Sequence, residues 1–267
     1  MSGEGGKMQN TLKTSVPALD RSVQILNYVS GCKHPPSAAE ITRHLRLPRS
    51  SAHALIAALT AHGLLHKNSE MRYTISGQVM SWANGFLAQQ DVVSLFNTEI
   101  VTCPELSAYS LTLTCLDEGD VVCLACHNGN SRLGFTFHMG LRLPAIFAAT
   151  GKAMLSSRPD KTIKPLFERY KDKPLTPHSV SDYQTLLNTL SQTKQRGYSI
   201  DDREIRDGMF CIGAAVFDQS HQARYGIALS MQKTESGADV VANLGKILRR
   251  NADNLSQRLG ADISLCP

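Results

Sequence analysis

A short run of polar and basic residues has the types and spacing to read DNA. It lies at the opening of a predicted helix that follows Pro48, and it consists of Arg49, Ser50, Ser51 and His53. The first turn of a recognition helix meets base edges in the major groove, so side chains of these types are needed at that place. An ordinary helical hairpin packed in a core is the alternative interpretation of the same segment.

Residues 37–65 also predict the two helices that would position this run. Helical spacing of the apolar residues Ala38, Ile41 and Leu45 indicates the first helix. Leu47 and Pro48 interrupt the pattern, which then resumes at i, i+3, i+4 and i+7 with Ala52, Leu55, Ile56 and Leu59. The sequence therefore predicts a helix-turn-helix.

The flanking segments complete a winged domain. Upstream, Ser15 is a candidate N-cap, Pro17 suits the first helical turn, and an apolar stripe is formed by Leu19, Val23, Leu26 and Val29. Downstream, residues 64–67 and 72–75 predict two short strands around a polar turn at 68–70. Such a wing can lie along the DNA backbone, with Lys67 and Arg72 as the expected phosphate contacts. Solvated surface charges are the other explanation for these two residues.

The positive charge of the chain is concentrated on this domain. The 267 residues carry a net charge of +5, and all of it falls within residues 1–80, which hold nine Lys and Arg against four Asp and Glu. A local positive field favours phosphate contacts and counterion release. The composition, with 42% apolar and 19% charged residues, suits a soluble globular chain, and no apolar run is long enough to span a membrane.

Residues 78–100 predict a helix that connects the winged domain to the rest of the chain. Its apolar residues include Trp82 and Phe86, which are more stable against a protein surface than in water. The segment is therefore a candidate dimerisation surface. Packing against the first domain explains the two aromatic residues as well.

Beyond residue 103 the pattern alternates between strands and helices. Residues 111–117 and 121–127 predict a β-hairpin with its turn at Glu118 and Gly119, and a third strand-like run covers 132–140. Helices are predicted from 149, over 182–197 and over 244–260, and strands over 208–218 and 223–232. Strands and flanking helices that share one sheet indicate an α/β or α+β sensor-like domain.

Small residues before Lys152 predict a place for a ligand. Ala149, Thr150 and Gly151 lie at the start of a predicted helix, where free N–H groups and the helix dipole favour an anionic group such as a carboxylate. Small side chains also let a ligand approach the backbone closely.

The motifs of both halves together resemble the IclR family of bacterial transcriptional regulators. The matching segments are residues 18–26, 45–59, 63–65, 71–77, 140–155, 196–218 and the closing helix that ends at Leu259 and Gly260. The resemblance implies an α+β chain with a winged helix-turn-helix over 15–77, a connector helix over 78–100, and a GAF-like α/β effector-binding domain over 101–267. Residues 1–14 are polar and glycine-rich and are expected to form a disordered tail.

The resemblance also implies residues that contact DNA. Arg49, Ser50, Ser51 and His53 match the DNA-reading motif of the family, and Arg21 and Arg72 are candidates for the backbone. The family commonly has Arg directly after the recognition-helix His, whereas this chain has Ala54. We therefore expect a different operator preference or more reliance on the wing.

The effector-pocket positions of the family fall on eight residues here. They are Phe135, Leu143, Ala149, Thr150, Asp201, Met209, Cys211 and Ser230. Apolar walls with a few hydroxyl, thiol and carboxylate groups suit a compact, partly apolar acid. Phe135 and Met209 favour an aromatic or branched ligand, or else they fill the core. Lys152 is expected to turn away from the pocket, and Arg142 is ambiguous for the same reason.

The expected function is DNA-binding transcriptional regulation, as a repressor of a catabolic operon controlled by a small organic acid, aromatic acids included. Family members usually form homodimers and often homotetramers. The alternative is a small-molecule sensor that acts on a protein partner without binding DNA. Without the apolar core of a signal peptide, the N-terminus favours a cytoplasmic location and no membrane contact.

No enzyme, cofactor or metal site is expected. The segment around Lys152 lacks the first glycine and the Ser or Thr of a phosphate loop, because Ile146 and Ala153 stand there. Cys211 lies in an apolar run, where thiols are usually inert. Cys123, Cys126 and His127 match the spacing of haem attachment, but they lie in a predicted strand and no second metal-ligand pair accompanies them.

Overall fold

The computed structural model describes residues 16–87, 91–129 and 136–266. The chain forms two compact units, residues 1–89 and 90–267. Ser15 and the expected tail lie outside the described residues. No helix in the described ranges is both long and apolar enough to cross a membrane.

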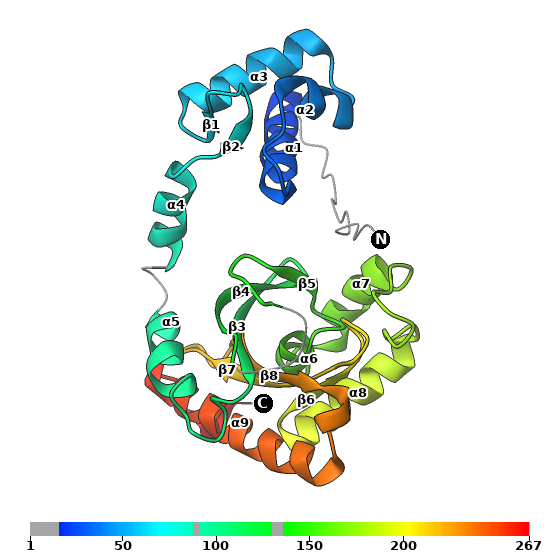
Figure 1. Cartoon of the computed structure of the whole chain (residues 1–267). Helices are drawn as coiled ribbons and strands as arrows, with labels where there is room; N and C mark the ends of the chain where they lie inside the picture. The colour runs from blue at the N-terminus through cyan, green and yellow to red at the C-terminus, as the bar shows by residue number, and fades with distance from the viewer. Residues whose placement is uncertain (1–15, 88–90, 130–135, 267) are drawn as a thin grey trace. The chain divides into compact units, whose positions relative to one another are not determined.

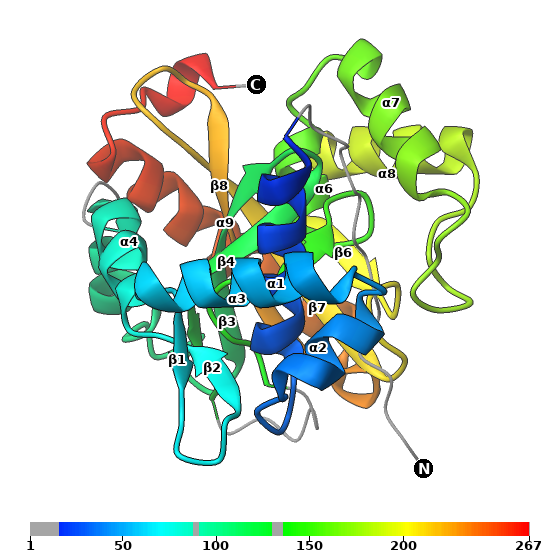
Figure 2. The same ribbon diagram turned by 90° about the horizontal axis from the view of Figure 1, so that it is seen from above.

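The first unit is a winged helix-turn-helix, as the sequence predicts. The elements are α1 (Pro17–Gly31), α2 (Ala38–His44), α3 (Arg49–Ala61), β1 (Leu65–Lys67), β2 (Tyr73–Ile75) and α4 (Gln78–Leu87). Figures 1 and 2 show helices α1 to α3 beside a small wing of β1 and β2, with α4 after it. β1 and β2 pair antiparallel, with His66 opposite Thr74.

Local signals in the sequence fix the ends of these helices. Pro17 lies in the first turn of α1, where its missing N–H costs nothing. Ser37 caps α2 and forms a reciprocal capping box with Glu40, so that two otherwise unpaired N–H groups are satisfied. Pro48 is the N-cap residue of α3. A proline disfavours helical conformation in the residue before it, so α3 begins only after Pro48.

The core of the first unit confirms the two predicted helix faces of the helix-turn-helix. Its fully buried residues are Ile25, Val29, Ile41, Ile56, Leu59, Leu65 and Tyr73. The predicted stripe of α1 is wrong in its first half, because Leu19 is 56% and Val23 46% exposed. The helix has apolar residues on two edges, and the Ile25–Val29 edge is the one that packs on the rest of the unit.

The expected single helix over 78–100 is divided between the units. α4 ends at Leu87 in the first unit, whereas α5 (Asp91–Leu95) and a π-helical turn η1 (Phe96–Ile100) belong to the second. Val92, Phe96 and Ile100 are buried in the main core of the second unit. The apolar spacing over 92–100 therefore serves the core of the second unit, while residues 88–90, between α4 and α5, lie outside the described residues.

A curled antiparallel sheet forms the centre of the second unit. The strand order is β5-β4-β3-β8-β7-β6. The strands are β3 (Ser110–Asp117), β4 (Asp120–His127), β5 (Arg142–Pro144), β6 (Ser199–Asp202), β7 (Met209–Phe217) and β8 (Ala223–Gln232). The predicted β3–β4 hairpin is confirmed, with Glu118 and Gly119 both at positive φ in its turn, as a two-residue hairpin turn requires. The strand expected over 132–140 is wrong for 136–140, and β5 follows it instead.

Helices cover the two faces of this sheet differently, as Figure 1 shows. They are α6 (Ala149–Leu155), α7 (Asp160–Tyr170), α8 (Tyr183–Arg196) and α9 (Ala238–Arg258), with short 3-10 turns η2 (Lys233–Glu235) and η3 (Ile263–Leu265). α9 packs on the face that carries Phe210, Ile212 and Ala214. α6 lies on the opposite face. The sequence predicted α6, α8 and α9 but not α7 or β6.

Two glycines let α6 approach the sheet. A Cβ at Gly213 of β7 would lie 2.5 Å from the carbonyl carbon of Ala149, and a Cβ at Gly226 of β8 would lie 2.8 Å from the Cβ of Thr150. Only glycine leaves room for this contact. The first turn of α6 is therefore seated directly on β7 and β8.

Candidate functional site

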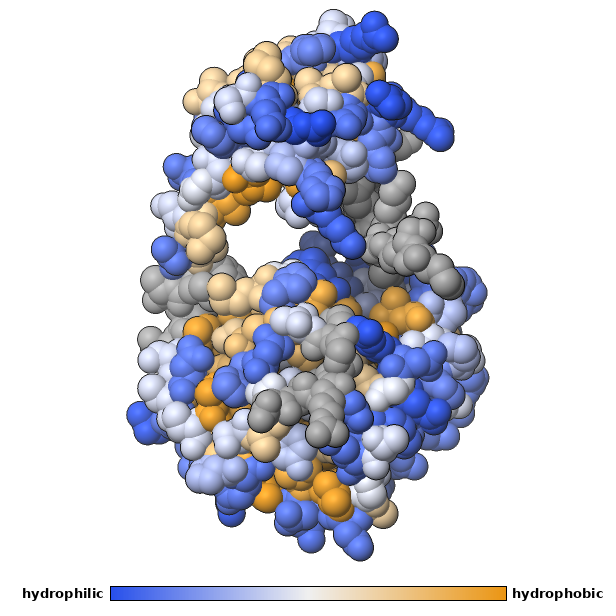
Figure 3. Space-filling model, in the orientation of Figure 1, coloured by the Kyte–Doolittle hydropathy of each residue, from blue (hydrophilic) through white to orange (hydrophobic). Residues whose placement is uncertain are grey.

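The structure presents the predicted DNA-reading residues at the start of α3. Arg49, Ser50 and His53 are exposed and Ser51 is half-buried, while Ala52 and Ile56 point into the core. Ala54 is exposed on the same outer side of the helix. Figure 3 shows predominantly hydrophilic residues at the α2–α3 end of the first unit. This arrangement leaves the first turn of α3 free to enter a groove of DNA.

The turn before α3 adds a guanidinium that sequence reasoning missed. Arg46 is exposed between α2 and α3, in the left-handed region at φ 51°. The only signal for it was its place between two predicted helices, next to the Leu47–Pro48 break.

Arg72 of the wing is held within the fold. Its Nη1 donates to the carbonyl oxygen of Pro35 at 2.8 Å and pairs with Glu40 Oε2 at 3.3 Å. The N–H of Tyr73 donates to the carbonyl oxygen of Pro36 at 2.9 Å. Hydrogen bonds from Ser37 lower the pKa of Glu40, so this carboxylate stays charged. Arg72 thus fastens the wing to the start of α2, and its side chain keeps 40% exposure.

The other two backbone candidates are less engaged. Lys67 places its Nζ 5.9 Å from the ring centre of Tyr73, which leaves the ammonium at the side of the wing. Arg21 is half-buried on α1.

On α4, Met80 is 56% and Trp82 58% exposed, whereas the side chain of Phe86 lies outside the described part of the chain.

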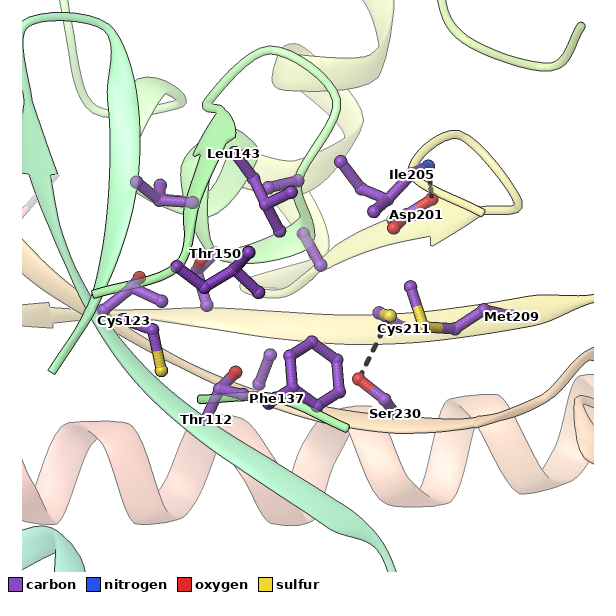
Figure 4. A pocket seen from close by; sticks show the side chains of 16 residues that line it. Thr112, Cys123, Phe137, Leu143, Thr150, Asp201, Ile205, Met209, Cys211 and Ser230 are labelled. Carbon is purple, nitrogen blue, oxygen red and sulfur yellow. Dashed lines mark hydrogen bonds between the residues drawn. The ribbon is translucent and has the colours of Figure 1, made fainter. Parts of the chain in front are cut away.

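A pocket lies in the second unit between one face of the sheet, the start of α6 and the loops that precede β5 and β7. Seven of the eight expected residues line it, and the eighth, Phe135, lies outside the described residues. Figure 4 shows Thr150 from α6, Asp201 from β6, Met209 and Cys211 from β7 and Ser230 from β8 around one space. Leu143 and Ala149 complete the set. Cys211 Sγ and Ser230 Oγ are 3.1 Å apart.

The pocket also has walls that sequence reasoning missed. They are formed by Thr112, Thr114, Val121, Cys123, Phe137, Leu141, Ala148, Ile205 and Ala228. Alternation in the run 111–117 places Thr112 and Thr114 on one face of β3, which was the available signal. The Thr114 hydroxyl is buried and has no hydrogen-bond partner among the described residues.

Asp201 carries the most perturbed carboxyl of the pocket. Its side chain is 1% exposed, and Oδ1 accepts hydrogen bonds from the N–H groups of Glu204 at 2.7 Å and Ile205 at 3.4 Å. Burial raises the pKa of Asp201 to about 7, against the lowering effect of Lys152. Near neutral pH this group can therefore be either an acid or a carboxylate.

Lys152 turns away from the pocket, as expected, but it is not a surface residue. It is 1% exposed and pairs with Glu204, which is 13% exposed. Burial raises the pKa of Glu204 although Lys152 lowers it, and burial raises the pKa of the Cys211 thiol well above its usual value. Lys152 therefore lies behind the pocket wall, as the buried cation beside two carboxyl groups.

Arg142 and Cys123 of the Cys-x-x-Cys-His segment make contacts within the fold. Arg142 Nη1 pairs with Asp117 Oδ2 at 2.7 Å, and its Nε pairs with Asp120 Oδ2 at 3.3 Å. Cys123 is buried within β4, and burial raises the pKa of its thiol to about 12. Within the described ranges no group of three or more His, Cys, Asp or Glu side chains is gathered as a metal ion would require.

Family models match both units. A model described as the C-terminal part of the bacterial transcriptional regulator IclR matches residues 86–257, and one described as the IclR helix-turn-helix domain matches residues 18–69. Together they include the exposed face of α3 and almost all of the pocket.

Known proteins share this organisation along nearly the whole chain. The repressor BlcR of Agobacterium tumefaciens is 43% identical, with a TM-score of 0.62 over 93% of this chain and 99% of that one. The transcriptional repressor AllR of Salmonella typhimurium is 24% identical over 259 residues, which are 97% of this chain and 95% of AllR. An IclR homologue from Microbacterium hydrocarbonoxydans, solved with 4-hydroxybenzoate, is 18% identical, with a TM-score of 0.72 over 92% of this chain and 100% of that one.

Proposed function

The chain belongs to the IclR family of bacterial transcriptional regulators, and from this premise we propose that it represses a catabolic operon under the control of a small organic acid. It is a DNA-binding regulator with a small-molecule effector domain. The proposal adds the sign of regulation, the kind of operon and the chemistry of the effector. The observation that carries it is a mostly apolar pocket with a few polar groups in a chain that also presents a recognition helix.

The relatives support the sign and the effector. BlcR and AllR are both named as repressors. The Microbacterium homologue holds 4-hydroxybenzoate, an aromatic acid. The apolar walls and the Asp201, Cys211 and Ser230 groups of this pocket suit a compact acid of the same general kind.

On the DNA side, the proposed contacts are made by the start of α3 and by the wing. Arg49, Ser50, Ser51 and His53 read the major groove, while Lys67, Arg21 and the exposed part of Arg72 meet phosphates. A sensor that acts only on a protein partner is not favoured, because the polar first turn of α3 would then have no use.

We also propose that the chain acts as a homodimer in the cytoplasm, where its DNA is. Leu19 and Val23 of α1 and Met80 and Trp82 of α4 are large apolar side chains exposed on the first unit. A second copy would cover them, since exposed apolar groups of this size favour association.

Binding to the DNA upstream of its own gene tests the proposed function. We expect tight, sequence-specific binding in a fluorescence anisotropy titration, weakening steeply as salt rises because phosphate contacts release counterions. Organic acids added at saturating concentration should release the DNA. If acids leave operator affinity unchanged while a neutral metabolite releases the DNA, the effector class is wrong but the regulator assignment stands.

Enlarging the pocket should alter the effector response alone. Thr150→Ala and Cys211→Ala each remove atoms from the wall, and we expect the acid concentration for half-release of the operator to shift by about tenfold, equivalent to about 1.4 kcal/mol. Operator affinity without acid should stay unchanged, because neither residue belongs to the first unit. An unchanged acid response in both variants would show that the effector binds elsewhere.

A further inference from the structure

The pocket presents a charge problem for an acid. The described residues that line the pocket include no Lys, Arg or His, and Asp201 is the one acidic residue among them. The nearest buried cation, Lys152, is already paired with Glu204. If all three groups are ionised, the buried cluster has one net negative charge, and an acid anion would add a second one to a site of low dielectric constant.

Taking the organic-acid effector of the proposed function as given, we propose that the acid binds together with one proton from solvent, carried by Asp201, which then donates a hydrogen bond to the bound carboxylate. Asp201 is thus a specificity-determining residue that selects a hydrogen-bond acceptor. The proton keeps the net charge of the occupied site no more negative than that of the empty, fully ionised one.

The backbone engages one oxygen of Asp201, and the Cys211 thiol at the pocket also hydrogen-bonds to this carboxyl. Oδ1 is occupied by the two backbone N–H groups of Glu204 and Ile205. Figure 4 shows the bond from the N–H of Ile205 to Asp201, which lines the same pocket as Cys211 and Ser230. A carboxylic acid whose first oxygen accepts from the backbone carries its proton on the second, which is the one facing the ligand.

Among the described residues, the charged or titratable groups near Asp201 lie on α6, on β7 and in the loop after β6. Lys152 of α6 favours the ionised form of Asp201, while Glu204 in the following loop opposes it. The Cys211 thiol of β7 is kept protonated by burial and hydrogen-bonds to Asp201. Asp202 is engaged on the outer side, where it pairs with Arg203 at 2.9 Å and Lys233 at 2.8 Å. Ser230 of β8 adds a neutral hydroxyl. Burial of Asp201, with a pKa of about 7, makes proton uptake available near neutral pH.

Calorimetric titration of the full chain tests the proposal. The probes are 4-hydroxybenzoate and hexanoate, each compared with its own uncharged primary amide, between about pH 6 and about pH 9. We expect affinity for the acids to fall by about tenfold for each pH unit above about 7, because one proton is bound with each ligand. Affinity for the amides should be flat, and buffers of different ionisation enthalpy should report uptake of about one proton per bound acid at the high-pH end.

Three variants distinguish the contribution of Asp201 to the pH dependence of acid binding from the contributions of neighbouring residues. Asp201→Asn keeps a hydrogen-bond donor of the same shape, so acid binding should lose its pH dependence. Glu204→Gln removes a neighbouring negative charge and frees Lys152 for Asp201, so the fall in affinity should begin at lower pH. Ser230→Ala is the matched pocket control, in which acid affinity drops at every pH and the slope remains.

A ligand-free measurement completes the test. A carboxyl whose pKa is raised on folding binds its proton more tightly in the folded state. Its contribution to stability is therefore fully present below about pH 4 and is lost as pH rises through about 7. The wild-type thermal midpoint should fall across that window relative to Asp201→Asn. Equal pH dependence of the two proteins would count against the proposal even in the absence of an effector.

The outcomes distinguish the proposal from the function on which it rests. Acid affinity that is flat with pH in the wild type, or a tenfold slope that persists in Asp201→Asn, overturns the proton link and leaves the acid effector in place. Failure of both acids and of their amides to bind at any pH overturns the acid effector and the proton link together.

Discussion

Replacement of Arg49 by Ala should abolish most of the specific operator binding and leave effector binding intact. Arg49 is exposed in the first turn of α3, and the loss of a guanidinium that contacts a base costs about 1–3 kcal/mol for each recognition helix. In a dimer on a two-fold operator the loss occurs twice. His53→Ala, one turn further along the same exposed side, should act in the same direction.

Anisotropy titrations with operator and with an unrelated DNA of equal length measure this effect. A base contact predicts that operator affinity falls far more than non-specific affinity. Arg224→Ala is the matched control, because it removes the same charge from an exposed position in the second unit. Equal weakening on both DNAs would reassign Arg49 to a phosphate contact. Loss of acid binding in the same variant would contradict the separation of the two units.

Replacement of Gly213 by Ala should destabilise the second unit and remove the effector response. The added Cβ would meet the backbone of Ala149 at 2.5 Å, which no flexible side chain can relieve. Overpacking of this kind typically costs about 1–3 kcal/mol. For a unit of this size that corresponds to a fall in thermal midpoint of about 2–4 °C per kcal/mol.

The loss of response follows from the place of the clash. Ala149 and Thr150 line the pocket, so a shift of α6 away from β7 changes its shape. Gly31→Ala is the control, since it is helical and no atom lies within 4 Å of the added Cβ. Scanning calorimetry together with acid titration gives both readouts. A midpoint and an acid response like those of Gly31→Ala would show that α6 adjusts without cost.

The predictable parts of the fold are those whose signals are local. Ser37 and Glu40, three residues apart, signal the start of α2, Pro48 marks the start of α3, and runs of apolar residues bounded by turns mark the long strands. The sequence missed β6, which has four residues, because so short a strand depends on its partner β7. α7 was missed because Pro165 interrupts its pattern from within.

The predictions from the sequence that were wrong concern which of two apolar surfaces of a helix is buried. Both Leu19–Val23 and Ile25–Val29 form apolar edges on α1, and only the neighbouring helices decide between them. Residues 91–100 have helical spacing in either unit, and their core in the second unit is formed by segments far along the chain.

The candidate pocket was reached through family resemblance and not through spacing. Its residues come from β3, β4, β5, β6, β7, β8, α6 and the loops between them, so no local pattern unites them. The Lys152–Glu204 pair, 52 residues apart in the chain, has no sequence signal at all. Only the fold reveals that the cation lies behind the wall and that Asp201 faces the ligand with its charge unbalanced.

The attachment of the wing to α2 limits how the effector can control DNA. Pro35, Pro36, Ser37 and Glu40 fasten Arg72 and Tyr73 through several hydrogen bonds and an ion pair. We therefore expect the first unit to move as one rigid body, in which α3 and the wing keep the same relative orientation. We do not expect an acid bound in the second unit to change the conformation of the first unit itself. In the proposed dimer, we therefore expect the effector to act on the distance and twist between the two first units, which must match one helical repeat of DNA or a multiple of it.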